Sequence, residues 1–176
     1  IDLYQKARIP LLVPVATGVA ITTTFAKEAE HYIFRNSAND DIQAQLVARE
    51  AVERRRFRKV AVFHDTTAYG AQGKDFLLAA LDKLGVKPVA VEAFPLGVAD
   101  LSGALDRARK AGAEVILTYT VGPELAVIAN SRAKLKWKAP IVGSWPLSWT
   151  NFLNAAKENA EGARMPQTFI EEPTTS

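Results

Sequence analysis

The chain has 176 residues, of which 48% are hydrophobic and 23% are charged, so it can bury a packed core and is not disordered throughout. The formal net charge of +3 comes from scattered Lys and Arg residues, and this pattern argues against a nucleic-acid-binding face. The lack of cysteine excludes disulfide bonds and thiolate metal sites, and no apolar run is long enough for a membrane span.

The chain begins IDLYQKARIPLLVP, without an initiating methionine or a signal peptide, and we interpret it as a fragment of a longer mature protein. Residues 7–18, ARIPLLVPVATG, predict a strand followed by a loop. Residues 18–30, GVAITTTFAKEAE, predict a helix.

Four short apolar runs farther along predict strands that are covered on both faces. They lie at 58–65, 87–94, 113–120 and 139–145. Helical patterns alternate with them, over 39–55, 70–84, 101–111, 123–136 and 148–156. Residues 161–173 predict a last strand, and the final residues are expected to be frayed.

Local signals mark the ends of the predicted helices. Asn39 is the predicted N-cap of the first of them, with Asp40 and Asp41 in the first turn, where the helix dipole favours acids. The basic run ERRRFRK, residues 53–59, then falls at the solvated end of that helix. Gly85 ends the following helix.

Strand–helix alternation with helices of this length implies right-handed crossovers and a parallel sheet. The sequence therefore predicts an α/β fold, with a doubly wound parallel sheet in a three-layer α/β/α arrangement. Ligands of such sheets bind beyond the carboxyl ends of the strands, where the strand order reverses. With a central strand at 58–65, the reversal lies between that strand and the one at 113–120. The residues expected to face this crevice are Tyr69, Tyr119, Thr120, Trp145 and Trp149.

The stretch HDTTAYGAQGKDF, residues 64–76, carries glycines and a lysine but does not have the spacing of a nucleotide loop. A P-loop needs four residues between its first glycine and Gly-Lys, followed by Ser or Thr, whereas GAQGKD has two and then an aspartate. Gly70 and Gly73 are instead expected to allow a tight helix entry and close packing.

No catalytic or metal-binding group is predicted. His64 ends an apolar strand and is interpreted as structural, and the side chains of His64 and Asp65 would point to opposite faces of the sheet. The sequence has no G-x-S-x-G nucleophile elbow, and its carboxylates lack metal-ligand spacing. We therefore expect no enzyme activity, no metal and no cofactor.

Several segments match one protein family in the order in which they occur. They are IPLLVPVAT, YIFRNSANDDIQAQLVAREAV, KVAVFHDTTAYGAQGKDF, LGVKPVAVEAFPLGVADLSGAL and AGAEVILTYTVGPELAVIANSRAKL. Within them lie Phe34-Arg35, the D-x-x-x-YG pattern that starts at Asp65, and Asp-Leu-Ser from Asp100. In these segments the chain resembles the type I periplasmic (extracellular) solute-binding proteins of ABC importers, in particular the branched-chain amino-acid (Leu/Ile/Val) binding proteins.

The resemblance implies two doubly wound lobes with a ligand cleft between them, of which this chain holds mainly the second. Residues 1–30 would be the end of the first lobe and the crossover. Residues 31–170 would be the second ligand-binding lobe, and residues 171–176 a frayed tail.

The resemblance also implies ligand contacts. The family's first-lobe loop, which binds the ligand carboxylate, matches Val15, Ala16 and Thr17. Its cleft tyrosine matches Tyr69. A second cleft position falls in TVGPE, residues 120–124, where this sequence has no aromatic residue.

The sequence also departs from the amino-acid binders at an acidic position of the cleft. Their acid that pairs with the ligand's α-amino group falls near Ser144 or Trp145, and it is missing here. Trp145 offers an apolar, aromatic surface instead. The implied ligand-binding residues are Thr17, Ala16, Val15, Tyr69, Thr120, Gly122 and Trp145.

The function implied is that of the solute-binding component of an ABC-type importer, which binds a small carboxylate-bearing solute, either an amino acid or an aromatic or aliphatic acid. The implied partners are this solute and the membrane permease subunits of the importer, with no nucleic acid and with self-association of the fragment. The implied location is periplasmic or extracellular, with a lipoprotein anchor in a Gram-positive source. Two alternatives stay open on the sequence: the effector-sensing domain of a lactose-repressor-like regulator or receptor, and an α/β enzyme.

Overall fold

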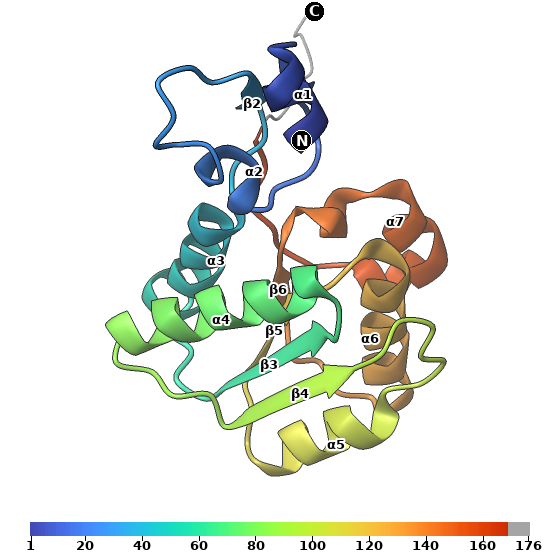
Figure 1. Cartoon of the computed structure of the whole chain (residues 1–176). Helices are drawn as coiled ribbons and strands as arrows, with labels where there is room; N and C mark the ends of the chain where they lie inside the picture. Colours follow the sequence, from blue (N-terminus) through green and yellow to red (C-terminus); the bar gives the residue numbers. More distant parts are fainter. Residues whose placement is uncertain (169–176) are drawn as a thin grey trace, which may run out of the picture.

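The computed structural model describes residues 1–168. Its centre is a four-stranded parallel sheet in the order β4-β3-β5-β6 (Figure 1). The strands are β3 (Val60–Asp65), β4 (Ala90–Phe94), β5 (Val115–Tyr119) and β6 (Ile141–Gly143). All four predicted central strands are confirmed, each shorter than the apolar run that predicted it.

The burial of the strands follows their place in the sheet. Every residue of β3, β5 and β6 is buried, as expected for strands covered on both faces. In β4, which lies at the edge, buried or half-buried residues alternate with the exposed Val91 and Ala93. The apolar run at 87–94 therefore belongs to a half-exposed edge strand.

Helices cover both faces of the sheet, which confirms the three-layer arrangement. On one face, α3 (Asp40–Arg49) and α4 (Ala68–Lys83) bury Val47 and Leu77 against Val62 and Leu117. On the other face lie α5 (Ser102–Lys110), α6 (Gly122–Lys134) and α7 (Thr150–Ala156). Full burial of one such Leu or Phe side chain contributes about 1.5–3 kcal/mol relative to exposure.

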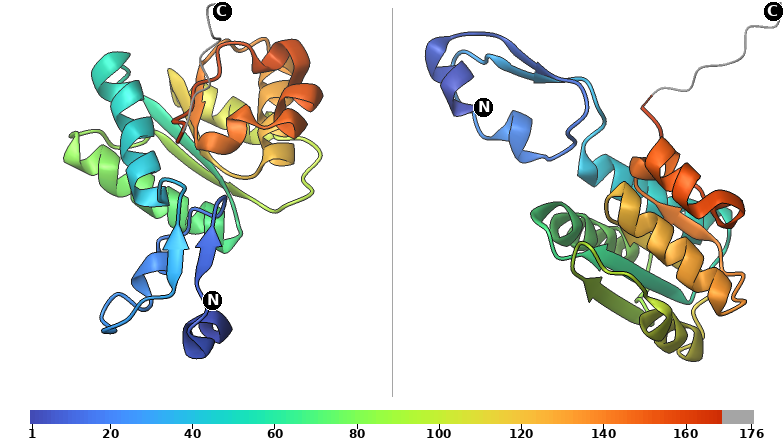
Figure 2. Two further views of the ribbon diagram at one scale, coloured as in Figure 1. Left: turned by 90° about the horizontal axis from the view of Figure 1, so that it is seen from above. Right: turned by 90° about the vertical axis from the view of Figure 1, so that its right-hand side faces the viewer.

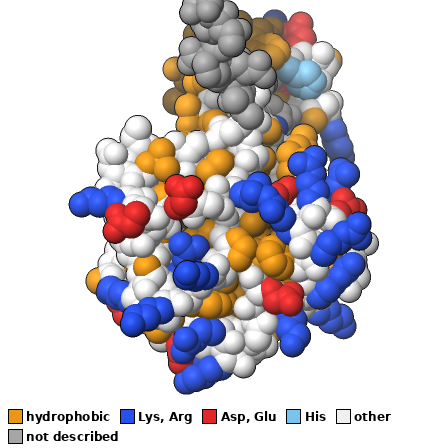
Figure 3. Space-filling model, turned by 180° about the vertical axis from the view of Figure 1, so that it is seen from behind, with side chains coloured by type: hydrophobic (Ala, Val, Ile, Leu, Met, Phe, Trp, Pro, Cys, Tyr) orange, Lys and Arg blue, Asp and Glu red, His pale blue; other side chains and the backbone are white. Residues whose placement is uncertain are grey.

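The predicted cap of α3 is confirmed, because the Asn39 side chain accepts a hydrogen bond from the backbone N–H of Ile42 at 2.8 Å. The helix predicted over 39–55 changes character along its length, since the α-helix ends at Arg49 and Glu50–Arg54 form a π-helical turn. The basic run that follows is solvent-exposed apart from Phe57, as predicted. Figure 3 shows that Lys and Arg side chains are spread over this side of the molecule with acidic side chains among them.

Residues 1–35 form a separate small unit, here called the N-terminal extension, and residues 36–168 are called the three-layer domain. The extension contains α1 (Asp2–Ala7), β1 (Leu11–Val13), α2 (Ala20–Thr23) and β2 (Ile33–Arg35). β1 and β2 pair in parallel as a two-stranded sheet. Figure 2 shows that the extension projects away from the domain.

The helix predicted over 18–30 is wrong in its length, since only Ala20–Thr23 is α-helical. The β-branched run Thr22–Thr24 has low helix propensity. The hydroxyls of Thr23 and Thr24 also donate back to the carbonyls of Val19 and Ala20 four residues earlier, which competes with regular helix growth.

The boundary predicted at residue 30 stays a prediction. The pairing of β2 with β1 supports a crossover a few residues later, after Arg35.

The strand predicted over 161–173 is reduced, within the described residues, to one parallel bridge between Arg164 and Val142. Pro166 lacks the N–H that a longer ladder would need. Residues 169–173 of the prediction lie outside the described residues. The short helix predicted over 148–156 is present as α7, preceded by the 3-10 turn Trp145–Ser148. No helix in residues 1–168 has the length and apolarity to span a membrane.

Candidate functional site

The strand order reverses at the predicted point. β3 lies between β4 and β5, so the chain leaves β3 toward one side and returns to build β5 and β6 on the other. The order therefore reverses between β3 and β5. The loops at 65–70 and 120–124 follow the carboxyl ends of these two strands.

The prediction that Tyr119 faces the crevice is wrong, because its side chain is fully buried. The alternation of β5 directs Tyr119 toward α3 and α4, and the phenol hydroxyl donates to Oδ1 of Asp40 at 2.7 Å. Its ring fits there because position 73 is a glycine, since a Cβ at Gly73 would overlap the Tyr119 ring. The packing role predicted for Gly73 is confirmed.

Tyr69 lies at the start of α4, half-buried, with its ring centroid 5.0 Å from that of Tyr119. Its hydroxyl donates to Oγ of Ser144, which is fully buried at the end of β6, at 2.9 Å. Burial raises the pKa of the Tyr69 hydroxyl well above its ordinary value, and burial does the same to the pKa of Tyr119. Both phenols are therefore neutral hydrogen-bonding groups at any physiological pH.

The loop at 15–18 sits against the start of α3. Val15 and Ala16 are exposed, whereas Thr17 is buried. The Thr17 carbonyl accepts from the backbone N–H of Asp40 at 3.1 Å and from Nη1 of Arg35 at 3.0 Å. The bond from Asp40 links the loop to the three-layer domain, whereas the bond from Arg35 holds it within the N-terminal extension.

Helix α7 packs against the loop that follows β5. Thr120 is fully buried, and its hydroxyl has no hydrogen-bond partner among the described residues. Gly122 is buried at the start of α6, where a Cβ would overlap the side chain of Asn151. Both residues lie beneath the surface, so the prediction that Thr120 faces the crevice is wrong, as it is for Tyr119.

The loop after β6 carries two tryptophans. Trp145 is half-buried and packs edge-on against Trp149, with 6.0 Å between the ring centroids. The backbone N–H of Trp145 donates to Oε1 of Gln43 at 3.2 Å. Trp145 is therefore tied to the first turn of α3, as Tyr119 and the Thr17 loop are.

The acids near the crevice are turned inward. Oδ1 of Asp65 accepts from the backbone N–H of Thr67 at 2.8 Å and from the Thr67 hydroxyl. Oε1 of Glu124 accepts from the N–H of Gly97 at 2.9 Å. Both carboxylates are buried and carry a second oxygen that has no partner among residues 1–168. Neither is open at the surface to pair with a ligand ammonium group.

His64 is buried, and its Nδ1 lies 2.8 Å from the carbonyl oxygen of Asp65 rather than from a carboxylate. This contact is typical of a structural histidine. Within the described chain, no group of three or more His, Cys, Asp or Glu residues has the geometry of a metal site.

Sequence reasoning missed the residues that join these segments, namely Asp40, Gln43 and Ser144. Asp40 and Gln43 are three residues apart, so they lie on one face of α3, and both are buried among apolar neighbours. The available signal was a pair of polar residues at helical spacing on the same stripe as Ala44 and Val47.

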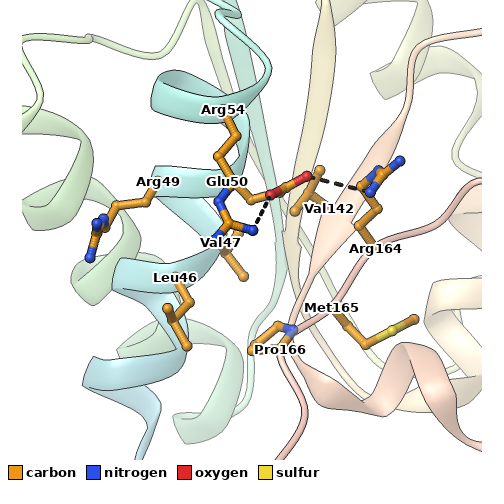
Figure 4. A pocket seen from close by; sticks show the side chains of 9 residues that line it. All are labelled: Leu46, Val47, Arg49, Glu50, Arg54, Val142, Arg164, Met165 and Pro166. Carbon is orange, nitrogen blue, oxygen red and sulfur yellow. Dashed lines mark ion pairs between the residues drawn. The ribbon is translucent and has the colours of Figure 1, made fainter.

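A hollow with a volume of about 410 Å³ lies away from this edge of the sheet, between α3 and the segment 164–166 (Figure 4). Glu50 stands in it between two arginines, with Oε2 3.6 Å from Nη1 of Arg54 and Oε1 3.5 Å from Nη1 of Arg164. None of the predicted ligand-binding residues lines this hollow.

Comparison with known proteins gives a consistent picture. The family model described as "Periplasmic binding protein" matches residues 1–176. A Leu/Ile/Val-binding protein homolog 3 from Brucella melitensis is 29% identical over 161 residues, which are 92% of this chain and 43% of that protein. An amino acid binding protein from Pseudomonas aeruginosa is 32% identical over 123 residues, which are 70% of this chain and 32% of that protein.

Among solved structures, a periplasmic binding protein type 1 from Bordetella pertussis matches with a TM-score of 0.79 and 26% identity, over 92% of this chain and 44% of that one. The chain therefore spans less than half the length of the relatives it matches.

Proposed function

Because the chain belongs to the periplasmic binding protein family, we propose that it supplies one ligand-binding lobe of the solute-binding component of an ABC-type importer. The observation that carries the proposal is the convergence of the Thr17 loop, Tyr69 and Trp145 around the carboxyl edge of β3, β5 and β6. The family is one of binding proteins rather than enzymes, and the named relatives bind amino acids.

We assign the direct ligand contacts to the residues that reach the surface of this edge, which are Val15, Ala16, Tyr69 and Trp145. The other residues implied by the sequence, Thr17, Thr120 and Gly122, are buried and would shape the loops that carry these contacts. Backbone N–H groups of the exposed part of the Thr17 loop would bind a carboxylate. The Trp145 ring would cover the apolar body of the solute. Support comes from the placement of both segments at the same edge of the domain.

The solute class that fits this edge is a carboxylate with an apolar or aromatic body. An α-ammonium group would need an anionic partner at the surface of this edge, and the carboxylates of Asp40, Asp65 and Glu124 are buried. Ser144 and Trp145 stand where the amino-acid binders are expected to carry an acid.

The experiment is calorimetry on the longer protein that contains this chain, with L-leucine in one series and benzoate with aliphatic carboxylates in another. Binding of a carboxylate that lacks an amine, with weak or no binding of leucine, is the expected result. Tight leucine binding would contradict the assigned solute class while leaving the binding role intact. No binding of any solute in either panel would count against the binding role itself.

The variant Trp145→Glu sharpens this test. A carboxylate at position 145 supplies the anionic partner, so leucine affinity should rise and affinity for the simple acid should fall. Leu153→Glu, which adds the same charge at an exposed position of α7, serves as the control. An equal response of both variants would argue against a specific role of position 145.

The cleft would lie between two lobes, so the chain by itself should bind solute weakly or not at all, because half of the contacts are missing. Micromolar binding by the isolated chain would contradict this arrangement. The partners of the complete protein would be the permease subunits of the importer, in the periplasm or outside the cell, with a lipoprotein anchor in a Gram-positive source.

The exposed face of the N-terminal extension supports self-association of the isolated chain. Leu12 and Phe34 are neighbours across the β1–β2 pair and are 63% and 49% exposed. A two-stranded parallel sheet with an apolar face open to water gains by covering that face with a second copy.

A further inference from the structure

We propose that the first turn of α3 positions the three crevice segments relative to one another, with Asp40 and Gln43 as the positioning residues. The placement of these segments follows from the structure alone, whereas the effect of that placement on solute affinity rests on the function proposed above. Neither residue is among the ligand contacts assigned to the crevice.

Asp40 connects two segments through different atoms. Its backbone N–H donates to the Thr17 carbonyl at 3.1 Å, and its carboxylate oxygen Oδ1 accepts from the Tyr119 hydroxyl at 2.7 Å. The Tyr119 ring in turn packs against Tyr69, with 5.0 Å between the ring centroids. One residue therefore fixes the Thr17 loop on one side and, through Tyr119, the tyrosine at the crevice on the other.

Gln43 adds the third segment from the same face of the helix. Its Oε1 accepts from the Trp145 N–H at 3.2 Å, and its Nε2 donates to the Ala38 carbonyl at 3.1 Å. The second bond holds the side-chain amide in the orientation that the first one needs. Together the two residues link the loops around Thr17, Tyr69 and Trp145 to a single helical turn.

The energetics favour this role over general stabilisation. Asp40 and Gln43 are each only 2% exposed, and burial of a carboxylate or amide costs free energy that its hydrogen bonds at best offset. An apolar residue would pack as well in this layer, which already contains Ala44 and Val47. Helix capping does not require Asp40 either, because Asn39 is the N-cap. What the two polar side chains add is a fixed direction for their partners.

The first experiment is hydrogen exchange on the chain itself, comparing Asp40→Ala with the neighbouring change Asp41→Ala. We expect Asp40→Ala to accelerate exchange at least fivefold in the peptide covering 117–122, because the Tyr119 hydroxyl loses its acceptor. The peptide covering 13–19 should change little, because the backbone N–H that donates to Thr17 remains. Asp41→Ala should leave both peptides unchanged. Asp40→Asn, which keeps an oxygen acceptor for Tyr119, should restore protection. Unchanged exchange at 117–122, or acceleration spread evenly over the whole domain, would overturn the proposal.

Tyr119→Phe provides a second route if Asp40→Ala does not fold, because it removes only the hydroxyl that Asp40 holds. We expect faster exchange around 65–72 with the core peptides of β3 unchanged. Wild-type exchange at 65–72 in this variant would count against the connection from Asp40 to Tyr69.

The second experiment tests the consequence for binding, with Gln43→Leu and the exposed control Gln45→Leu in the longer protein. L-leucine and benzoate serve as probes, together with the melting temperature of each variant. We expect Gln43→Leu to weaken binding of the better probe about tenfold with a melting temperature near that of the control. Unchanged affinity in Gln43→Leu would overturn the positioning role. Failure of the unmodified protein to bind either probe would count against the proposed solute class. The hydrogen-exchange experiment would then decide the positioning role.

Discussion

The three-layer domain and the N-terminal extension both contain parallel strands, but they differ in what covers those strands. In the domain, β3 and β5 are buried at every position because helices lie on both faces of the sheet. In the extension, Leu12 of β1 and its register partner Phe34 of β2 are exposed. The parallel sheet is therefore covered on both faces in the domain, whereas in the extension one apolar face is left exposed to solvent.

The difference shows where the stability of the chain must reside. A parallel strand needs apolar cover on both faces, and only the domain supplies it from its own sequence. The extension is held to the domain by a few polar contacts, among them the Thr17 carbonyl with Asp40 and the Ala16 carbonyl with the Ser37 hydroxyl. Its position is well defined by these contacts, but its apolar surface is left uncovered.

The largest expected effect comes from removing apolar volume in the domain. Leu117→Ala, in the fully buried centre of β5, should lower the free energy of unfolding by about 2–5 kcal/mol through lost burial and a cavity. Leu12→Ala, the matched change in the extension, should stay within about 0.5 kcal/mol. Denaturant unfolding measures both. Equal losses would break the comparison between the two regions.

The next effect tests the close packing of α4 on β5. Gly73→Ala places a methyl group into the Tyr119 ring, and the shift that it forces should cost about 1–3 kcal/mol. Gly103→Ala, in the exposed first turn of α5 with open space around it, should instead stabilise by about 0.5–1 kcal/mol. Thermal unfolding should show a lower melting temperature for Gly73→Ala and a higher one for Gly103→Ala. A stabilised Gly73→Ala variant would contradict the observed packing.

The domain could be predicted from the sequence because its signals are local. Short apolar runs separated by capped amphipathic helices give both the elements and their parallel order, and Asn39 fixes the start of α3. The edge position of β4 could not be predicted from the sequence, because an apolar run such as 87–94 has the same composition in a central strand as in an edge strand.

The extension and the details of the site could be predicted only in part, because they depend on contacts between distant segments. The threonines after Ala20 shortened the predicted helix through bonds to their own backbone. Tyr119 was assigned to the crevice because it ends a strand, but the alternation of β5 and the space at Gly73 turn it inward. The bond from Asp40 joins residues 79 positions apart, and no local pattern reveals it.

A smaller and more specific effect is expected at the crevice. In the longer protein, Tyr69→Ala should weaken solute binding by about 1–3 kcal/mol, from one hydrogen bond and part of an aromatic contact. Tyr4→Ala, at an exposed position of α1, should leave affinity unchanged. Calorimetry measures the solute affinity of both variants. Equal losses of affinity in the two variants would mean that binding responds to the extension as much as to the crevice.

The smallest effect on stability belongs to the exposed face of the extension, where the comparison predicts almost none. The double change Leu12→Asp and Phe34→Asp adds two charges at exposed positions, so the melting temperature of the domain should stay within one or two degrees, corresponding to about 0.5 kcal/mol or less. The same variant should shift the isolated chain toward the monomer in light scattering coupled to size-exclusion chromatography, because like charges then face each other across any contact between two copies. Val89→Asp with Val91→Asp, two partly exposed positions at the β4 edge of the domain, is the matched control. A chain that is already monomeric, or that dissociates equally in the control, would show that the β1–β2 face does not drive association.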